Sequence, residues 1–159
     1  LPADATVQLN LHVPDSMSLD PLGNIVLDSQ GDQELIIVSN PGASNQRILH
    51  LPLTYHSNDG TAGVEVDDTN FATSSSGYFL VADKTLNATY AIHKKAFAPG
   101  AAYTAADGAH FVGALDMSTG FITPIVTGLP NPGGLVFVDT SGAPQSTALA
   151  CGVPSNPSN

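Results

Sequence analysis

Alternating polar and apolar residues predict short β-strands along most of the chain. The clearest run is Thr6–Val13, where the two kinds of residue alternate up to Pro14. This period of two is typical of a strand with one buried face. Further strands are predicted at 23–27, 34–39, 46–53, 63–67, 78–82, 89–93, 110–116, 121–126 and 134–139. Turn signals separate the runs at intervals of roughly 8–12 residues, which is the pattern of all-β proteins.

Two stretches are less regular. Residues 78–98 contain no Gly or Pro, so a helix over 84–97 is an alternative. The alternation of Tyr90 and Ile92, together with β-branched and aromatic residues, favours a strand instead. Residues 99–108 are rich in Gly and Ala and are predicted to form a loop. The runs on either side of Met117–Gly120 are predicted to pair as a hairpin.

One pattern recurs along the chain: a short strand, an Asp and then a turn that contains Gly. It occurs around Asp20, Asp67 and Asp139, at spacings of 47 and 72 residues. Residues 94–109 are interpreted as an insertion that lengthens the second spacing. Periods of this size, with about four strands each, are typical of β-propeller blades.

The segments 77–92 and 115–135 carry a resemblance to a family. Gly77-Tyr-Phe-Leu-Val-Ala-Asp, followed by a small turn and Thr-Tyr-Ala-Ile, resembles the strand–turn–strand core of NHL-type and SMP-30-like propellers. The resemblance covers about residues 16–140. It implies an all-β fold of antiparallel β-propeller-like blades, with a β-sandwich as the alternative. We expect a single domain over 1–150 and a flexible C-terminal tail over 151–159.

The blade count is incomplete. The chain holds about two and a half blades, whereas propellers close with about 4–8. Three explanations are open. The chain is part of a longer one, or another copy or another subunit completes a ring with it, or its sheet edges pair from chain to chain in an open filament.

Composition restricts the partners. The chain of 159 residues has 4 basic and 14 acidic residues, a formal net charge of −10. Nucleic acid is excluded as a partner because phosphate contacts need Lys and Arg. No apolar run approaches the roughly 18 residues of a membrane-spanning helix. Low charge, and a start at Leu1 as after a removed signal peptide, indicate a secreted or cell-surface protein. Asn87 lies in a glycosylation sequon, and the lone Cys151 is a candidate for an intermolecular disulfide.

Clustered carboxylates are the candidate metal ligands. Asp28, Asp32 and Glu34 lie within seven residues, and Ca²⁺ prefers such oxygen ligands. A solvated polar turn is the alternative, because the segment has no Gly at the sharp-turn position of a calcium loop and no bidentate Glu at its twelfth position. The resemblance to SMP-30-like lactonases, which hold a metal in the central channel, adds Glu65, Asp67 and Asp139. We expect the protein to bind no cofactor, and Ca²⁺ is the one alternative that we consider.

Catalytic motifs are lacking in the sequence. The five histidines have no metal spacing to one another, and there is no nucleophile elbow or phosphate loop. The leading hypothesis is a non-enzymatic structural protein that self-assembles as a homo-oligomer, or binds another protein chain, through its sheet edges. The alternatives are a metal-dependent hydrolase or lactonase of the SMP-30-like class and a carbohydrate- or peptide-binding module.

Overall fold

The computed structural model of the chain describes residues 8–142. Within this range the fold is all-β, and the one helical segment is a 3₁₀ turn at Gln30–Asp32. The strands are β1 (Pro14–Leu19), β2 (Ile25–Ser29), β3 (Glu34–Ser39), β4 (Arg47–Pro52), β5 (Thr54–Ser57), β6 (Gly60–Gly63), β7 (Asp68–Phe71), β8 (Gly77–Asp83), β9 (Ala88–His93), β10 (Ala102–Ala106), β11 (Phe111–Asp116), β12 (Phe121–Thr127) and β13 (Pro132–Asp139). The prediction of an all-β fold is confirmed.

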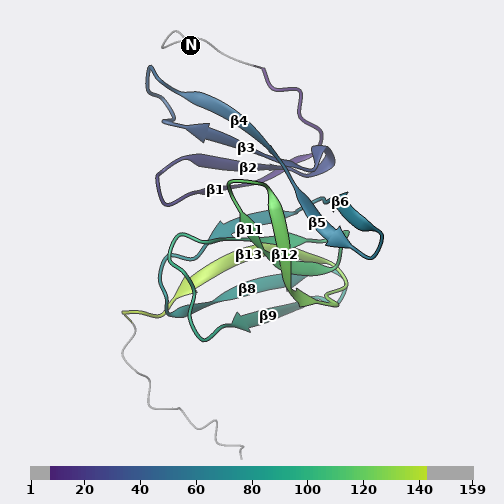
Figure 1. Cartoon of the computed structure of the whole chain (residues 1–159). Helices are drawn as coiled ribbons and strands as arrows, with labels where there is room; N and C mark the ends of the chain where they lie inside the picture. Colours follow the sequence, from purple (N-terminus) through teal and green to yellow (C-terminus); the bar gives the residue numbers. More distant parts are fainter. Residues whose placement is uncertain (1–7, 143–159) are drawn as a thin grey trace, which may run out of the picture.

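The strands form three sheets that stack as layers (Figure 1). Sheet A is the meander β1-β2-β3-β4. Sheet B has the order β6-β5-β12-β11-β10-β7 and lies in the middle, and sheet C has the order β13-β8-β9. All pairs are antiparallel except β5 with β12. None of the sheets closes on itself, so the described part of the chain is an open stack of antiparallel sheets.

Sheet B is buried on both faces at β10, which lies between β11 and β7. All five of its residues are buried. Ala102 and Ala106 pack in the core shared with sheet A, whereas Tyr103 and Ala105 point into the core shared with sheet C. A strand with two buried faces has no polar alternation, which is the reason that the expected loop over 99–108 is wrong.

The two cores differ in character. The core between sheets A and B is mainly aliphatic, with Leu35, Ile37 and Ile122 at its centre. The core between sheets B and C is built on aromatic rings. Phe79 lies 4.7 Å from Tyr103 and 5.0 Å from Phe137, measured between ring centroids in tilted and edge-on arrangements. These are the distances at which aromatic pairs add to the stability that burial provides.

The chain does not build its sheets one after another. After β7 in sheet B it crosses to sheet C for β8 and β9, returns to sheet B for β10–β12, and ends in sheet C with β13. Strand β7 lies against β1 on one side and against β13 on the other. The three strands therefore lie side by side, one from each sheet, and sheet C is completed by residues about fifty positions apart along the chain.

Several predicted strands have different bounds in the structure. The strand predicted at Thr6–Val13 does not form over residues 8–13, and residues 6 and 7 lie outside the described range. Strand β1 starts instead at Pro14. Segment 64–67 pairs in no ladder and lies between β6 and β7. The helix considered over 84–97 does not form, whereas the hairpin of β11 and β12 is confirmed. Residues 8–142 include no helix long and apolar enough to cross a membrane.

Candidate functional site

Buried acidic side chains meet where the three sheets adjoin, and we call this site the acidic junction. It comprises Ser16 from β1, Asp28 from β2, and Asp68 and Thr69 from β7. The Ser16 hydroxyl lies 2.9 Å from Oδ2 of Asp28 and 2.8 Å from Oδ1 of Asp68. Thr69 donates a hydrogen bond of 2.6 Å to Oδ1 of Asp28. The backbone N–H of Leu135 in β13 donates to Oδ2 of Asp68 at 2.6 Å. The junction therefore joins all three sheets by hydrogen bonds.

Burial changes the protonation of this junction. Asp28 is fully buried, and burial raises its pKa to about 7, although hydrogen bonds from Thr69 and Ser16 oppose the shift. Burial also raises the pKa of Asp68. Removing a carboxylate from water disfavours its charged form, so the neutral form of Asp28 persists close to neutral pH.

Asp67 and Lys84 form an ion pair beside the junction. Asp67 has a nearly buried side chain, whereas half of the Lys84 side chain is exposed. The hydrogen bond to Asp67 raises the pKa of Lys84. Burial, followed by the charge of Asp67, raises the pKa of Asp15. The pair leaves Asp67 neutralised by a cation from the turn after β8.

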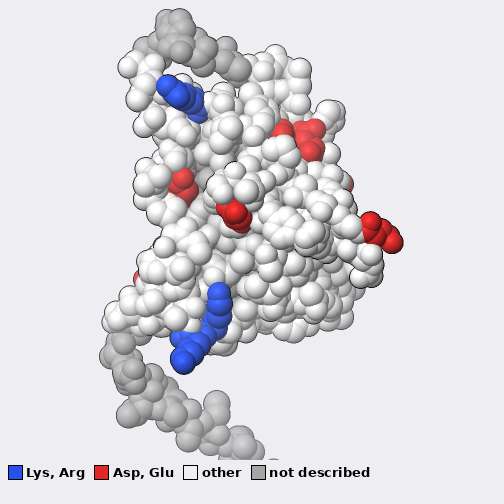
Figure 2. Space-filling model, viewed as in Figure 1, with Lys and Arg blue, Asp and Glu red and all other residues white. Residues whose placement is uncertain are grey.

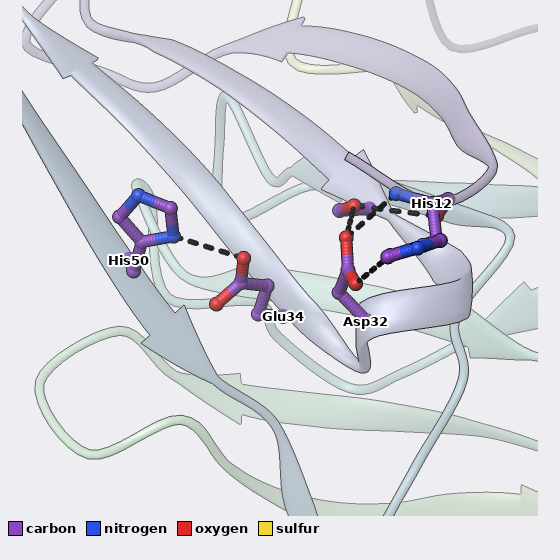
Figure 3. A network of polar contacts seen from close by, with 5 residues as sticks. His12, Asp32, Glu34 and His50 are labelled. Atoms are coloured by element: carbon purple, nitrogen blue, oxygen red, sulfur yellow. Dashed lines mark hydrogen bonds and ion pairs between the residues drawn. The ribbon is translucent and has the colours of Figure 1, made fainter. Parts of the chain in front are cut away.

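Asp32 and Glu34 each contact a histidine instead of each other (Figure 3). Asp32 accepts hydrogen bonds from the backbone N–H of His12 at 2.8 Å and from Ser29 at 2.7 Å, and Nδ1 of His12 lies 2.7 Å away. The backbone hydrogen bond from His12 is the main reason that the pKa of Asp32 is lowered to about 2. Glu34 contacts Nδ1 of His50 at 2.9 Å across β3 and β4.

Glu65 and Asp139 lie apart from the other candidate ligands. Glu65 is exposed and lines an open hollow of about 240 Å³ with Gln33 and Tyr55. Asp139 ends β13, where it accepts hydrogen bonds from the backbone N–H of Ser141 at 2.7 Å and from the Ser74 hydroxyl at 2.8 Å. Hydrogen bonds from Ser141 lower the pKa of Asp139. The contacts of Asp139 are those of a surface turn.

The six predicted ligands are therefore distributed over separate sites. Asp28 points inward to the junction, away from the histidine pairs of Asp32 and Glu34. Across residues 8–142 there is no group of three or more His, Cys, Asp or Glu side chains close enough together to hold a metal ion. The described part of the chain therefore contains no preformed cluster of side chains that supports the calcium hypothesis.

The outer face of sheet A, turned away from sheet B, is apolar. In the register of the sheet, Met17 lies opposite Leu27 and Leu19 lies opposite Ile25. On the face opposite to the core residues, one row runs through Met17, Leu27 and Ile36 and ends at His50 on β4, and a fully aliphatic row runs through Leu19, Ile25, Val38 and Ile48. Exposure is greatest on β1, where Met17 is 70% exposed and Leu19 is 65% exposed, whereas Ile36 on β3 is fully buried.

The outer face of sheet C is also largely apolar. Leu80 lies opposite Val136 on β13 and opposite Ala91 on β9, and Tyr78 lies opposite Val138. Val136 is 49% exposed. Both ends of the three-layer stack therefore present apolar sheet faces to the surroundings.

Comparison with known proteins adds no relative. No family model matches the chain, and neither a curated protein nor a solved structure is significantly similar to it. The resemblance to NHL-type and SMP-30-like propellers therefore stays a prediction from the residues quoted above.

Sequence reasoning named Asp28 and Asp67 as ligands but did not place Ser16, Asp68 or Thr69 beside Asp28, nor Asp68 and Thr69 in a strand. The missed signal is Asp68-Thr69-Asn70-Phe71, in which Thr69 and Phe71 are buried at alternate positions. Asn87 is exposed in the turn between β8 and β9, with a positive φ of 49°. Cys151 lies outside the described residues.

Proposed function

We propose that this protein has a non-enzymatic, structural role and assembles with another folded protein chain through the unpaired surfaces of sheets A and C. The observation that carries the proposal is the exposed apolar outer face of sheet A, on which Met17 and Leu19 expose most of their side chains. Contiguous apolar patches of this kind mark interaction surfaces, because leaving them in water costs roughly 25 cal/mol for each Å².

The residue pattern of sheet A supports this role. An antiparallel sheet with one face in water normally alternates apolar and polar residues. Strand β3 instead reads Leu35-Ile36-Ile37-Val38, with apolar side chains on both faces. Sheet B, which is covered on both sides, has the same kind of pattern in β10. The sequence of sheet A is therefore suited to a sheet that is covered on both faces.

Charge supports the same role. Only 11% of the residues are charged, and on the side of the molecule in Figure 2 the charged side chains are few and scattered. Burying a charge without a partner is costly, so a surface with few charges is easier to cover. The proposed partner is a protein, because the four basic residues provide little to bind phosphate groups.

The test compares wild-type protein with the Met17→Glu/Leu19→Glu variant in extracts of the native source under non-denaturing conditions. The native mass of the species that carries the chain is measured. We expect the wild-type chain in a species of at least twice the mass of its own denatured chain, and the variant at the mass of one denatured chain. Wild type at the mass of one denatured chain in the extract would refute the proposal.

We further propose a secreted or cell-surface location. The low charge, the sequon at the exposed Asn87 and the lone Cys151 support it. Treatment of the native protein with an N-glycosidase should lower its mass, and Asn87→Gln should remove that change. A native protein recovered from the cell interior, with no mass change on treatment, would contradict this location.

A further inference from the structure

We propose that the partner is a second copy of this chain, and that two copies pair head to tail into a closed ring of six sheets. The outer face of sheet A of each copy lies on the outer face of sheet C of the other. This inference rests on the proposed function, since it names the partner of the same apolar faces.

The terminal strands β1, β7 and β13 adjoin, so the three sheets diverge from one line, and the two apolar faces belong to the first and the last of them (Figure 1). The two faces are therefore different surfaces. Contact between different surfaces gives an open filament unless rotation closes it into a ring. In a two-fold ring each copy uses both of its ends, and no apolar end remains in water. The ring would contain two times three sheets, which lies within the range of about 4–8 at which propellers close.

The area favours the ring over a filament. Three strands at about 4.8 Å spacing, each about 20 Å long, give sheet C a face of roughly 300 Å². One contact between sheets A and C then buries about 600 Å² in total, below the approximately 1,000 Å² of a specific interface. A ring contains two such contacts, and its total of about 1,200 Å² reaches the range of stable pairs.

Residues 8–13 provide a second, independent observation. Sheets A and B each contain a run of four antiparallel neighbours, β1–β4 and β7-β10-β11-β12, whereas sheet C has three strands and ends at β9. Every residue of β9 except Ala88 and Ile92 is exposed, and the strand contains no Pro or charged Lys, Arg, Asp or Glu. Such an edge is open to the addition of a strand.

The connection between β12 and β13 shows where such a strand would come from. The last strand of the sheet B meander, β12, leads through four residues into β13, the first strand of sheet C. Residues 8–13 likewise come before the first strand of a sheet, since they directly precede β1 of sheet A. They alternate as Gln8-Leu9-Asn10-Leu11-His12-Val13, yet form no strand in the structure of the single chain. In the ring, residues 8–11 would pair with β9 of the second copy, beside the sheet that covers sheet A, while His12 and Val13 keep their backbone hydrogen bonds to residues 30–32.

The first measurement is the mass of the purified chain, alone and with reductant, by light scattering across a hundredfold dilution. We expect a species of twice 16.3 kDa that dissociates to the single chain at low concentration. A single chain at every concentration would overturn the inference, and so would a polymer whose mass rises without limit. Proposed function survives a single-chain result if the chain is still part of a heavier species in the native extract.

Variants test which faces are used. Met17→Glu/Leu19→Glu on sheet A and Val136→Glu on sheet C should each raise the dimer Kd by at least about 100-fold, because each places charge in both contacts. Asn58→Glu, in the exposed β5–β6 turn, is the matched control and should leave Kd within about twofold. Circular dichroism spectra like that of the wild type would show that all variants are folded.

Mixing the two face variants gives a result that only head-to-tail pairing predicts. In the mixed pair both sets of substitutions fall in one contact, and the other contact joins two wild-type faces. We expect the mixture to form dimer at concentrations at least about tenfold below those needed by either variant alone. No gain on mixing would overturn head-to-tail pairing.

The strand is tested at Asn10, whose side chain is exposed. Asn10→Pro removes a backbone N–H and should weaken the dimer at least about tenfold, whereas Asn10→Thr, which suits a strand, should not weaken it. Equal Kd values for the two variants would refute the pairing of residues 8–11 with β9.

Discussion

The carboxyl groups of Asp28 and Asp68 share one hydroxyl group, that of Ser16, which lies 2.9 Å from the first and 2.8 Å from the second. One hydroxyl proton cannot be donated to two carboxylates at once. With a neutral Asp28 the conflict disappears: Asp28 donates to Ser16, and Ser16 donates to Asp68. The raised pKa of Asp28 agrees with this arrangement. The proton on Asp28 then completes the hydrogen-bond chain from β2 through Ser16 to Asp68.

This proton makes the stability of the fold depend on pH. The pKa of Asp28 is about 7 in the folded chain and about 3.9 in an unfolded one. Between these values the folded chain binds more protons, so the free energy of unfolding falls as pH rises from about 4 to 7. The loss from this group is on the order of 4 kcal/mol over the whole window. Urea unfolding at several pH values measures it.

The matched variant is Asp28→Asn, which copies the neutral side chain. Its carbonyl oxygen can still accept from Thr69, and its NH₂ group can donate to Ser16. We expect the variant to be more stable than the wild type at pH 8 and to lose most of the pH dependence between 4 and 7. If the free energy of unfolding of the variant still fell between pH 4 and 7 as in the wild type, Asp28 would not be the group that titrates in this range.

Thr69→Val removes the hydroxyl that donates to Asp28 at 2.6 Å and keeps the shape of the side chain. A buried acceptor without its donor costs about 1–3 kcal/mol, and we expect that loss in the free energy of unfolding. Thr104→Val serves as the comparison. Its hydroxyl donates to the backbone oxygen of Asp68 at 3.0 Å and lies 3.2 Å from the Thr69 hydroxyl, but it has no hydrogen bond to Asp28, so its loss should change the pH dependence less. If pH dependence changes more in Thr104→Val than in Thr69→Val, the assigned hydrogen bond to Asp28 is wrong.

The local pattern of polar and apolar residues predicted strands that have polar residues at both ends. It did not predict strand β10 of sheet B. Strand β3 was predicted with the bounds it has, because Glu34 and Ser39 frame an apolar run. Strand β10 was taken as a loop because Ala102–Ala106 shows no alternation of polar and apolar residues and lies in a stretch rich in Gly and Ala. Its burial depends on two sheets packing against it, which is a tertiary property. The crossing from β7 to β8 and back is likewise absent from local sequence.

The acidic junction shows the same limit. The proximity of Asp28 to Asp68 arises from the packing of β2 on β7, forty residues apart, so spacing along the chain grouped Asp28 with Asp32 and Glu34 instead. Alternation did place Ile36 and Leu35 on opposite faces of a strand. What sequence could not show is which of these faces sheet B would cover, and hence which face stays outside.

The contact between His12 and Asp32 predicts an unusually acidic carboxyl group. The pKa of Asp32 is about 2, so the hydrogen bonds to it persist at pH values above 4 and are lost as pH falls from about 4 to 2. NMR titration should show the His12 amide signal shifting with a midpoint near 2. Ser29→Ala removes one donor to Asp32 and should raise that midpoint. A wild-type midpoint near 4 would mean that the backbone N–H of His12 does not donate a hydrogen bond to Asp32 in solution.

Gly120 is predicted to be the glycine that tolerates substitution least. Its φ is +74°, and a Cβ atom there would lie 1.9 Å from the backbone oxygen of Pro52, where no side-chain rotation can relieve the clash. Gly128 has a similar φ of +79° but nothing within 4 Å of the added atom. Gly128→Ala therefore carries only the backbone cost of about 1–2 kcal/mol. In Gly120→Ala the clash must also push β12 away from the end of β4. We therefore expect the free energy of unfolding to fall by at least about 3 kcal/mol. Chemical denaturation of both variants at pH 7 measures the difference, and equal losses would show that β12 and Pro52 are not packed this closely.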